Sequence, residues 1–274
     1  MKEKITFSFG KNWKNYIKTS LNKQRLDLAE RSIRESLKIR NLNGKVFMDI
    51  GCGSGIFSLS AYKLGAKKVI SFDVDPYSVE CCKYLRSREL NPEIWEAYNG
   101  SVLDEKFLSK LPKADIVYSW GVLHHTGNMW KAIENAASKV KDNGYFYITI
   151  YNKKVGLRGS KNQLKLKKIY NWSPYALKKC LEYTVIAGYF VKNFIMLRNP
   201  FRLIREKEKS TLNRGMSYRV DVLDWLGGLP YEFARPQEIF DFCTKKLKLQ
   251  LMDIYMVDER NLLGNNRYLF RKPK

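Results

Sequence analysis

The sequence predicts an α/β protein in which a doubly wound parallel sheet carries helices on both faces. Short apolar strands alternate with helical segments between residues 45 and 151, as in a chain of β-α units. One of these strands runs directly into a turn with three glycines, from which a helix begins. With 274 residues, the chain is long enough for one large domain or for a domain with an insertion.

An amphipathic helix is predicted over residues 20–41, because its apolar residues recur at helical spacing. The predicted strands cover 45–50, 68–73, 93–99, 114–120 and 145–151, and the helices between them cover 57–64, 76–87 and 129–140. We expect a turn at Asp142-Asn143-Gly144 to end the last of these helices. After a helix over 235–247, segments 249–258 and 266–272 are predicted to form an antiparallel pair, joined by a turn at Gly264-Asn265-Asn266.

The alternation stops after residue 151, and the charge changes at the same point. Residues 152–219 carry 17 basic and 3 acidic side chains, and a helix is expected to start at Ser173-Pro174. Residues 1–44 are also basic, whereas 45–151 and 220–274 are nearly neutral. The net charge of the whole chain, +23, therefore comes mainly from residues 1–44 and 152–219. We therefore divide the chain into an N-terminal helical segment (1–44), a core (45–151 and 220–274) and a basic helical insertion (152–219).

The chemistry is concentrated in the stretch VFMDIGCGSGIF, which spans residues 46–57. Its glycines do not have the G-x-G-x-x-G spacing of a dinucleotide site, and the chain has no G-x-x-x-x-G-K-[ST] phosphate loop. Asp49 precedes the glycines and would repel a phosphate, but it suits a cationic amino group. The next strand ends in Asp73, whose carboxylate can accept both hydroxyls of a ribose. These features together predict S-adenosylmethionine as the ligand.

The stretches VFMDIGCGSGIFSLSAYKLGA and VISFDVD resemble motifs I and II of class I S-adenosylmethionine-dependent methyltransferases. The resemblance continues through NGSVLD, DIVYSWGVLHHTG and NGYFYITIYN, and it implies a Rossmann-like sheet of seven strands with a C-terminal antiparallel hairpin. The flanks FSFGKNW, SWGVLHHTGNMW and RGMSYRVDVLDWLGGLPYEFARPQEIF also resemble a generic bacterial subgroup close to polyprenyl-quinol methyltransferases. No acceptor follows from the subgroup resemblance.

The family resemblance implies which residues bind the cofactor and its product, S-adenosylhomocysteine. Asp49 and the glycine turn would face the methionine moiety, Asp73 would bind the ribose, and Val74 would flank the adenine. Many relatives have Asp at the adenine edge where this chain has Ser101. The implied cofactor residues are Asp49, Gly51, Cys52, Gly53, Gly55, Asp73, Val74, Ser101, Val102, Trp120 and Gly121.

The two histidines of the chain, His124 and His125, both follow the fourth predicted strand, where the acceptor site is expected. One of them, with His125 preferred, is a candidate general base, and activity would then rise through a pKa near 6.5. The alternative is that both are structural loop residues. The residues expected to face the acceptor are Tyr151, Asn152, Arg219, Asp221, Asp224 and Trp225. The last four of these also fit a simpler interpretation, in which an Asp caps a helix after a turn and the Trp packs in the core.

These features favour methylation of a small molecule, with O-methylation of a sugar, a quinol or another hydroxylated metabolite preferred. An RNA methyltransferase and a non-catalytic cofactor-binding protein are the alternatives. The insertion has three interpretations: a lid over the acceptor, a helix over 175–203 that lies on a membrane, or an RNA-binding surface.

Five cysteines without C-x-x-C spacing, and no secretory signal, lead us to expect a reduced cytoplasmic protein without a bound metal. The longest apolar run, residues 183–197, is too short and too polar for us to expect a membrane span.

Overall fold

The computed structural model describes residues 21–156, 159–209, 218–257 and 264–274. The motif FSFGKNW lies outside these residues. The first described helix, α2 (Lys23–Leu37), begins where the Asn22 side chain accepts a hydrogen bond from the backbone N–H of Arg25. It ends at Lys38, whose left-handed backbone (φ 55°) closes the last turn.

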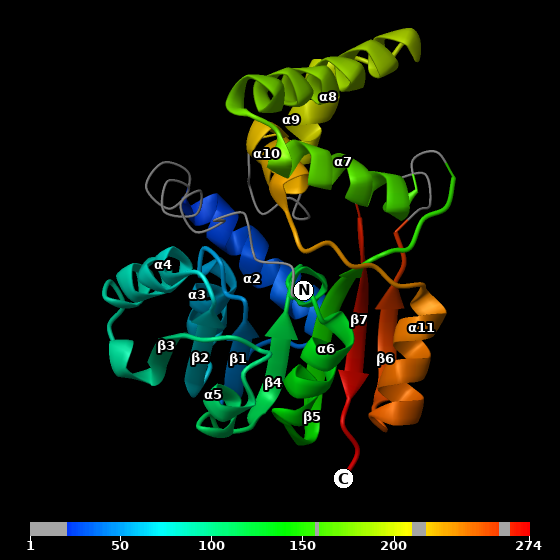
Figure 1. The fold of residues 1–274 in the computed structure, drawn as a ribbon. Helices are drawn as coiled ribbons and strands as arrows, with labels where there is room; N and C mark the ends of the chain where they lie inside the picture. The colour runs from blue at the N-terminus through cyan, green and yellow to red at the C-terminus, as the bar shows by residue number, and fades with distance from the viewer. Residues whose placement is uncertain (1–20, 157–158, 210–217, 258–263) are drawn as a thin grey trace.

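A seven-stranded sheet in the order β3-β2-β1-β4-β5-β7-β6 forms the centre of the protein (Figure 1). The strands are β1 (Val46–Ile50), β2 (Lys68–Asp73), β3 (Trp95–Asn99), β4 (Ala114–Ser119), β5 (Val140–Tyr151), β6 (Gln250–Tyr255) and β7 (Asn265–Arg271). The first five strands are parallel to one another, and β7 pairs antiparallel with both β5 and β6. The predicted doubly wound sheet and its C-terminal antiparallel pair are confirmed.

Two apolar cores lie on opposite faces of this sheet. One face is covered by α2 with α3 (Ile56–Lys63) and α4 (Pro76–Arg86). The other is covered by α5 (Glu105–Ser109), α6 (Met129–Ser138) and α11 (Pro236–Asp241). Strand side chains alternate between the two cores, as the pleat of a β-strand requires.

Several local predictions are wrong in an instructive way. Asp142-Asn143-Gly144 does not end a helix: it forms an irregular part of β5, where the register to β4 shifts and Asn143 has a φ of 62°. Asn265 and Asn266 pair with β5 as part of β7, so they do not form a turn. The helix predicted over 235–247 is α11 followed by a π-helical turn over 242–246. Helix α5 was not predicted.

A layer of helices lies over the carboxyl ends of the parallel strands (Figure 1). It consists of α7 (Ser160–Trp172), α8 (Tyr175–Ile195), α9 (Pro200–Lys209) and α10 (Tyr218–Gly227). Its own apolar cluster joins Tyr170, Val222 and Leu226 to side chains of α8 and α9. The expected boundary between residues 219 and 220 therefore falls inside α10, which packs with the insertion.

No single helix among the described ranges is long and apolar enough to cross a membrane. Helices α8 and α9 meet these criteria only as a pair, and the pair is bent by 114° at its break.

The N-terminal helix α2 should contribute to global stability, because it buries Ile33 and Leu37 in the core shared with β1 and α3. We expect Ile33→Ala to lower the free energy of unfolding by about 2–5 kcal/mol, as cavities in packed cores do. Leu90→Ala is the control, because Leu90 is 95% exposed. Urea denaturation of both variants measures this; an equally small effect for both would mean that α2 is not part of the core.

Candidate functional site

The glycine turn connects the end of β1 to α3 and is shaped by three left-handed residues. Gly51, Gly53 and Gly55 have φ values of 72°, 53° and 78°, which side chains with a Cβ rarely adopt. The backbone N–H groups of Gly51 and Cys52 both donate to the carbonyl of Phe72, at 2.8 and 3.1 Å. These bonds fix the turn against the end of β2.

The surroundings of Gly51 exclude a larger side chain, as its left-handed backbone also does. A Cβ there would lie 2.4 Å from a methyl carbon of Val122, in the loop after β4. The glycine turn and the β4 loop are therefore in direct contact. A ligand held by the turn would lie next to the residues that follow β4.

Asp49 ends a chain of buried hydrogen bonds that crosses the sheet. Trp95 Nε1 on β3 donates to Ser71 Oγ on β2 (2.8 Å), and Ser71 Oγ donates to Ser58 Oγ on α3 (2.7 Å). Ser58 Oγ in turn donates to Asp49 Oδ2 at 2.6 Å. None of the four side chains is more than 2% exposed. The Asp49 carboxylate is thus held in one orientation from beneath.

Burial raises the pKa of Asp49 to about 7, and the negative charge of Asp73 adds to this, while the Ser58 hydrogen bond opposes it. A buried carboxylate of this kind gains most from a nearby cation, which offsets the cost of its charge. An ammonium group, such as the amino group of a methionine moiety, therefore fits this position.

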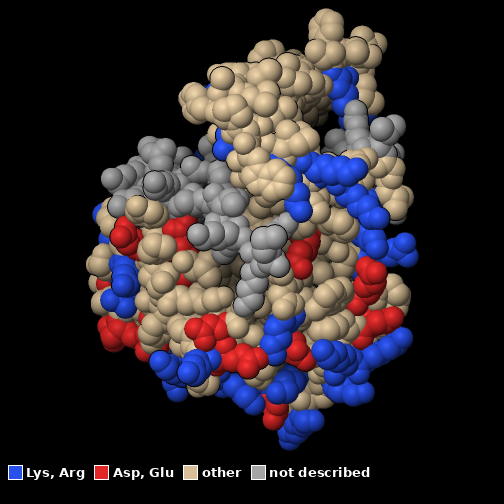
Figure 2. Space-filling model, viewed as in Figure 1, with Lys and Arg blue, Asp and Glu red and all other residues tan. Residues whose placement is uncertain are grey.

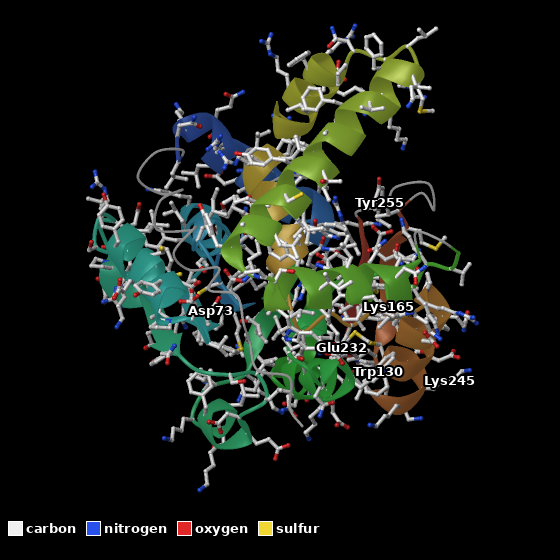
Figure 3. The ribbon with its side chains drawn as sticks, turned by 45° about the horizontal axis from the view of Figure 1, so that its top comes forward. Asp73, Trp130, Lys165, Glu232, Lys245 and Tyr255 are labelled. Carbon is white, nitrogen blue, oxygen red and sulfur yellow. The ribbon has the colours of Figure 1, made fainter. Side chains whose placement is uncertain are left out.

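Asp73 lies at the end of the neighbouring strand β2, beside the same turn (Figure 3). Its Oδ2 accepts from the N–H of Gly53 at 3.0 Å, and its Oδ1 accepts from the N–H of Asp75 at 2.9 Å. Burial raises its pKa to about 6, against the effect of these two hydrogen bonds. A partly exposed carboxylate in this position suits the vicinal hydroxyls of a ribose.

The other residues that we predict to bind the cofactor differ in how their side chains are placed. Val74 follows Asp73 and is 45% exposed, so it can cover a flat ring. Ser101 is partly exposed, and its Oγ accepts from the N–H of Leu103. Val102 and Cys52 are buried: Val102 packs in the core beside α6, and hydrogen bonding to Cys82 and burial raise the pKa of the Cys52 thiol. Both side chains are therefore largely enclosed by the protein.

The loop after β4 forms the other wall of the site. Trp120 packs against Phe57 of α3, with ring centroids 6.3 Å apart. The next residue, Gly121, has a φ of 72° and donates its N–H to Thr149 Oγ1 on β5 at 2.7 Å. Both residues predicted to line the cofactor and acceptor sites are therefore fixed to the elements around them.

The two histidines follow in a short 3₁₀ turn, and their environments differ. His125 is partly exposed, and its Nδ1 lies 2.5 Å from the carbonyl oxygen of Pro230. Because a carbonyl only accepts, Nδ1 carries the proton, and in the neutral ring the lone pair lies on Nε2. His124 has no exposed surface, and burial, followed by the proximity of His125, holds its pKa well below 6.5. His124 is therefore neutral at pH 7.

Tyr151, predicted to face the acceptor, lies beside both histidines at the end of β5. Its ring centroid is 4.1 Å from that of His124 and 5.4 Å from that of His125. The following residue, Asn152, forms an isolated parallel β-bridge with Ala234. These predicted acceptor residues are thus brought together with the β4 loop.

The segment 229–234 supports this wall and was not predicted to belong to the site. Both carboxylate oxygens of Glu232 accept from the N–H of Met129 at the start of α6, and its own N–H donates to the carbonyl of His124. Ala234 donates its N–H to Tyr151 O at 3.1 Å. Figure 3 shows Glu232 beneath α7. In the sequence, the one indication of this segment is the stretch PYEF, which lies in the flank that resembles the bacterial subgroup.

Lys167 of α7 is a second residue that sequence reasoning missed. Its side chain is fully buried, its ammonium donates to the carbonyl of Trp225, and it lies 4.7 Å from the ring centroid of Tyr231. Burial lowers its pKa to about 7, although Asp224 opposes the shift. Lys167 therefore joins α7, α10 and the segment that supports the histidines.

The other expected acceptor residues are less uniform. Trp225 is linked to the histidine region indirectly: the Lys167 ammonium lies over the rings of both Trp225 and Tyr231, and Tyr231 packs beside Tyr151. Arg219 does not join this group, because it is exposed and lies near Lys179 at the start of α8. The side chain of Asp221 lies outside the described residues. Among the described side chains, no group of three or more His, Cys, Asp and Glu residues could hold a metal ion.

Removing the hydroxyl under Asp49 should weaken cofactor binding in a pH-dependent way. Ser58→Ala removes the hydrogen bond that lowers the Asp49 pKa, so less carboxylate is ionised near neutral pH. We expect up to about tenfold weaker binding of S-adenosylhomocysteine at about pH 6.5, and a smaller effect at about pH 8.5. Titration calorimetry measures both.

Ser60→Ala is the matched control, because Ser60 is equally buried on α3 but donates only to the Ile56 carbonyl of its own helix. A uniform loss across pH in Ser58→Ala, or the same loss in Ser60→Ala, would contradict this role for Ser58.

Comparisons with known proteins agree with this fold. The N-methyltransferase NodS from Bradyrhizobium japonicum, solved with S-adenosyl-L-homocysteine, superposes with a TM-score of 0.52 at 11% identity, over 98% of this chain and 100% of that chain. Magnesium protoporphyrin IX methyltransferase from Synechocystis PCC 6803, also with bound SAH, gives a TM-score of 0.55 at 15% identity, over 97% and 95%. Similarities at this level of identity show a shared fold.

Among curated proteins, the ribosomal protein L11 methyltransferases of Tolumonas auensis and Vibrio parahaemolyticus are each 49% identical to this chain, over 77 and 83 residues. These matches cover 28% and 30% of this chain, and 26% and 28% of the relatives, so the chain matches only about a quarter of their length. The family model described as "Methyltransferase domain" matches residues 21–184, which is more than half of the chain. The chain therefore belongs to this family of methyltransferase domains.

Proposed function

We propose that this protein is an S-adenosylmethionine-dependent methyltransferase that methylates a hydroxyl group of a small molecule. The observation that carries the proposal is the position of His125. It follows β4, directly beside the loop that contacts the glycine turn, and its Nδ1 proton is committed to Pro230. This arrangement holds an imidazole in one orientation within the loop that also contacts the glycine turn, which supports the proposal.

The residues at the strand ends fit the cofactor. Asp49 would hold its amino group, Asp73 its ribose hydroxyls, and Val74 would cover the adenine. When bound, S-adenosylmethionine supplies an electrophilic methyl group, so the protein mainly needs to align the acceptor and exclude water.

His125 would accept the proton that the acceptor hydroxyl loses. With Nδ1 donating to Pro230, Nε2 of the neutral ring is the basic nitrogen. His124 is fully buried, so we assign it a supporting role beneath Tyr151 instead of proton transfer.

The helical layer favours a small acceptor. Through Lys167 and Tyr231, α7 and α10 are fixed over the segment that supports the histidines. A helical layer in this position would exclude water from the methyl transfer and limit the size of an acceptor that binds beside Tyr151. The basic charge of this layer supports the alternative of an RNA acceptor, and the curated relatives suggest a protein acceptor, as their names state for ribosomal protein L11.

Transfer of labelled methyl groups tests the proposal. Purified protein and methyl-labelled cofactor are added to a cell extract, which is then separated into lipid, low-mass aqueous, nucleic-acid and protein fractions. Label in lipid or low-mass material supports the proposal. Label that nuclease or protease removes would assign an RNA or a protein acceptor, and the absence of any transfer would indicate a cofactor-binding protein.

We expect His125→Asn to lower kcat by about 100-fold or more, because it removes the base. Asn retains an amide donor near the position of Nδ1, so the contact with Pro230 and the folded state should survive. Binding of S-adenosylhomocysteine and thermal stability are the controls and should match those of the wild type. A kcat within about threefold of the wild type would exclude His125 as the base.

A further inference from the structure

The corner between α8 and α9 exposes a group of large apolar side chains that the proposed function does not use. At this corner Phe194 is 78% exposed, Leu197 is 96% exposed, and Phe201 is 71% exposed. Val191, Ile195 and Met196 surround them and are also exposed. We call these six residues the apolar tip.

The apolar tip is distinct from the face of α8 that packs inside the protein. Val185, Ile186 and Tyr189, on α8, contact the cluster around Tyr170 and Tyr218. The tip lies beyond this contact, at the end of the helical layer far from the sheet (Figure 1). Its apex is Leu197, whose left-handed backbone (φ 53°) turns the chain from α8 towards α9. Exposed apolar groups of this size mark an interaction surface.

Basic side chains surround the tip. Lys192 and Arg198 are exposed beside it, and Arg202 follows on α9, where Glu206 pairs with it. The one acidic residue of α8, Glu182, is buried and accepts hydrogen bonds from Tyr170 and Lys179. Figure 2 shows uncharged side chains over the top of the molecule with Lys and Arg at their margins, while Asp and Glu appear over the sheet layers below, together with further Lys and Arg.

We propose that the apolar tip docks this protein on the surface of an anionic lipid bilayer. A convex apolar corner with a cationic margin fits the boundary between acyl chains and anionic headgroups, which takes up the side chains while the cations remain at the headgroups. A second copy of the chain is the weaker occupant, because a symmetric contact through this corner would bring the two basic margins together.

The docking is peripheral. No described helix is long and apolar enough to cross a bilayer alone, and α8 and α9 are bent by 114° relative to each other. Lys178 and Lys179, in the first turns of α8, lie at the opposite end from the tip. Only the corner therefore enters the lipid.

Vesicle flotation of the full chain without cofactor tests this inference, independently of methyl transfer. We expect the protein to float with phosphatidylcholine vesicles that contain phosphatidylglycerol, and to float much less with pure phosphatidylcholine or in high salt. The variant Phe194→Ser/Leu197→Asn should lower the partition coefficient by about tenfold or more, because two large apolar side chains no longer enter the lipid. Asn is chosen at position 197 because it tolerates a left-handed backbone.

Leu90→Ser is the matched control, since Leu90 is as exposed as Leu197 but lies between α4 and β3. It should leave flotation unchanged, and circular dichroism should show that all variants are folded. Absence of wild-type protein from the floating anionic vesicles would overturn the proposal. So would equal flotation of the tip variant and Leu90→Ser. Light scattering that shows a dimer in solution, lost in the tip variant, would assign the surface to a second copy.

Discussion

The buried carboxylate of Asp49 is the constraint on which the site depends. A negative charge at the end of β1 is costly without a cation, and burial, with the nearby charge of Asp73, raises the pKa of Asp49 to about 7 even against the Ser58 hydrogen bond. The chain through Ser58, Ser71 and Trp95 provides one hydroxyl donor but no positive charge. The protein therefore maintains a carboxylate that is incompletely compensated until a cationic ligand arrives. The left-handed glycine turn beside it allows that ligand to approach the backbone.

That the glycine turn and Asp73 meet could be predicted from the sequence, because the signals are local. A strand, the glycine turn and a second strand ending in Asp73 lie within 30 residues, and their alternation fixes which ends meet. The acceptor half could not be predicted in this way. Glu232 binds the backbone of Met129 across 103 residues, and Lys167 binds that of Trp225 across 58. No periodicity indicates such pairs, and Arg219 was placed with them only because it is near in sequence.

The helical layer combines two surfaces with different requirements. Its lower side packs over the strand ends through Lys167 and Tyr231, where the proposed transfer would need water to be excluded. Its far corner leaves Phe194 and Leu197 in solvent, where burial would require a partner. A single insertion thus covers the strand ends and presents an apolar tip. The basic residues of 152–219 include Lys192 and Arg198 beside that tip, and they also include the fully buried Lys167.

We infer that the ammonium group of the cofactor compensates the negative charge of Asp49 when the cofactor binds. Proton release on binding tests it most directly. Calorimetric titration with S-adenosylhomocysteine at about pH 6.5, in buffers of different ionisation enthalpy, gives the number of protons exchanged. Because Asp49 is largely protonated below its pKa of about 7, the account predicts net proton release, and much less release in Asp49→Asn. Equal proton exchange in the two proteins, or net uptake by the wild type, would contradict it.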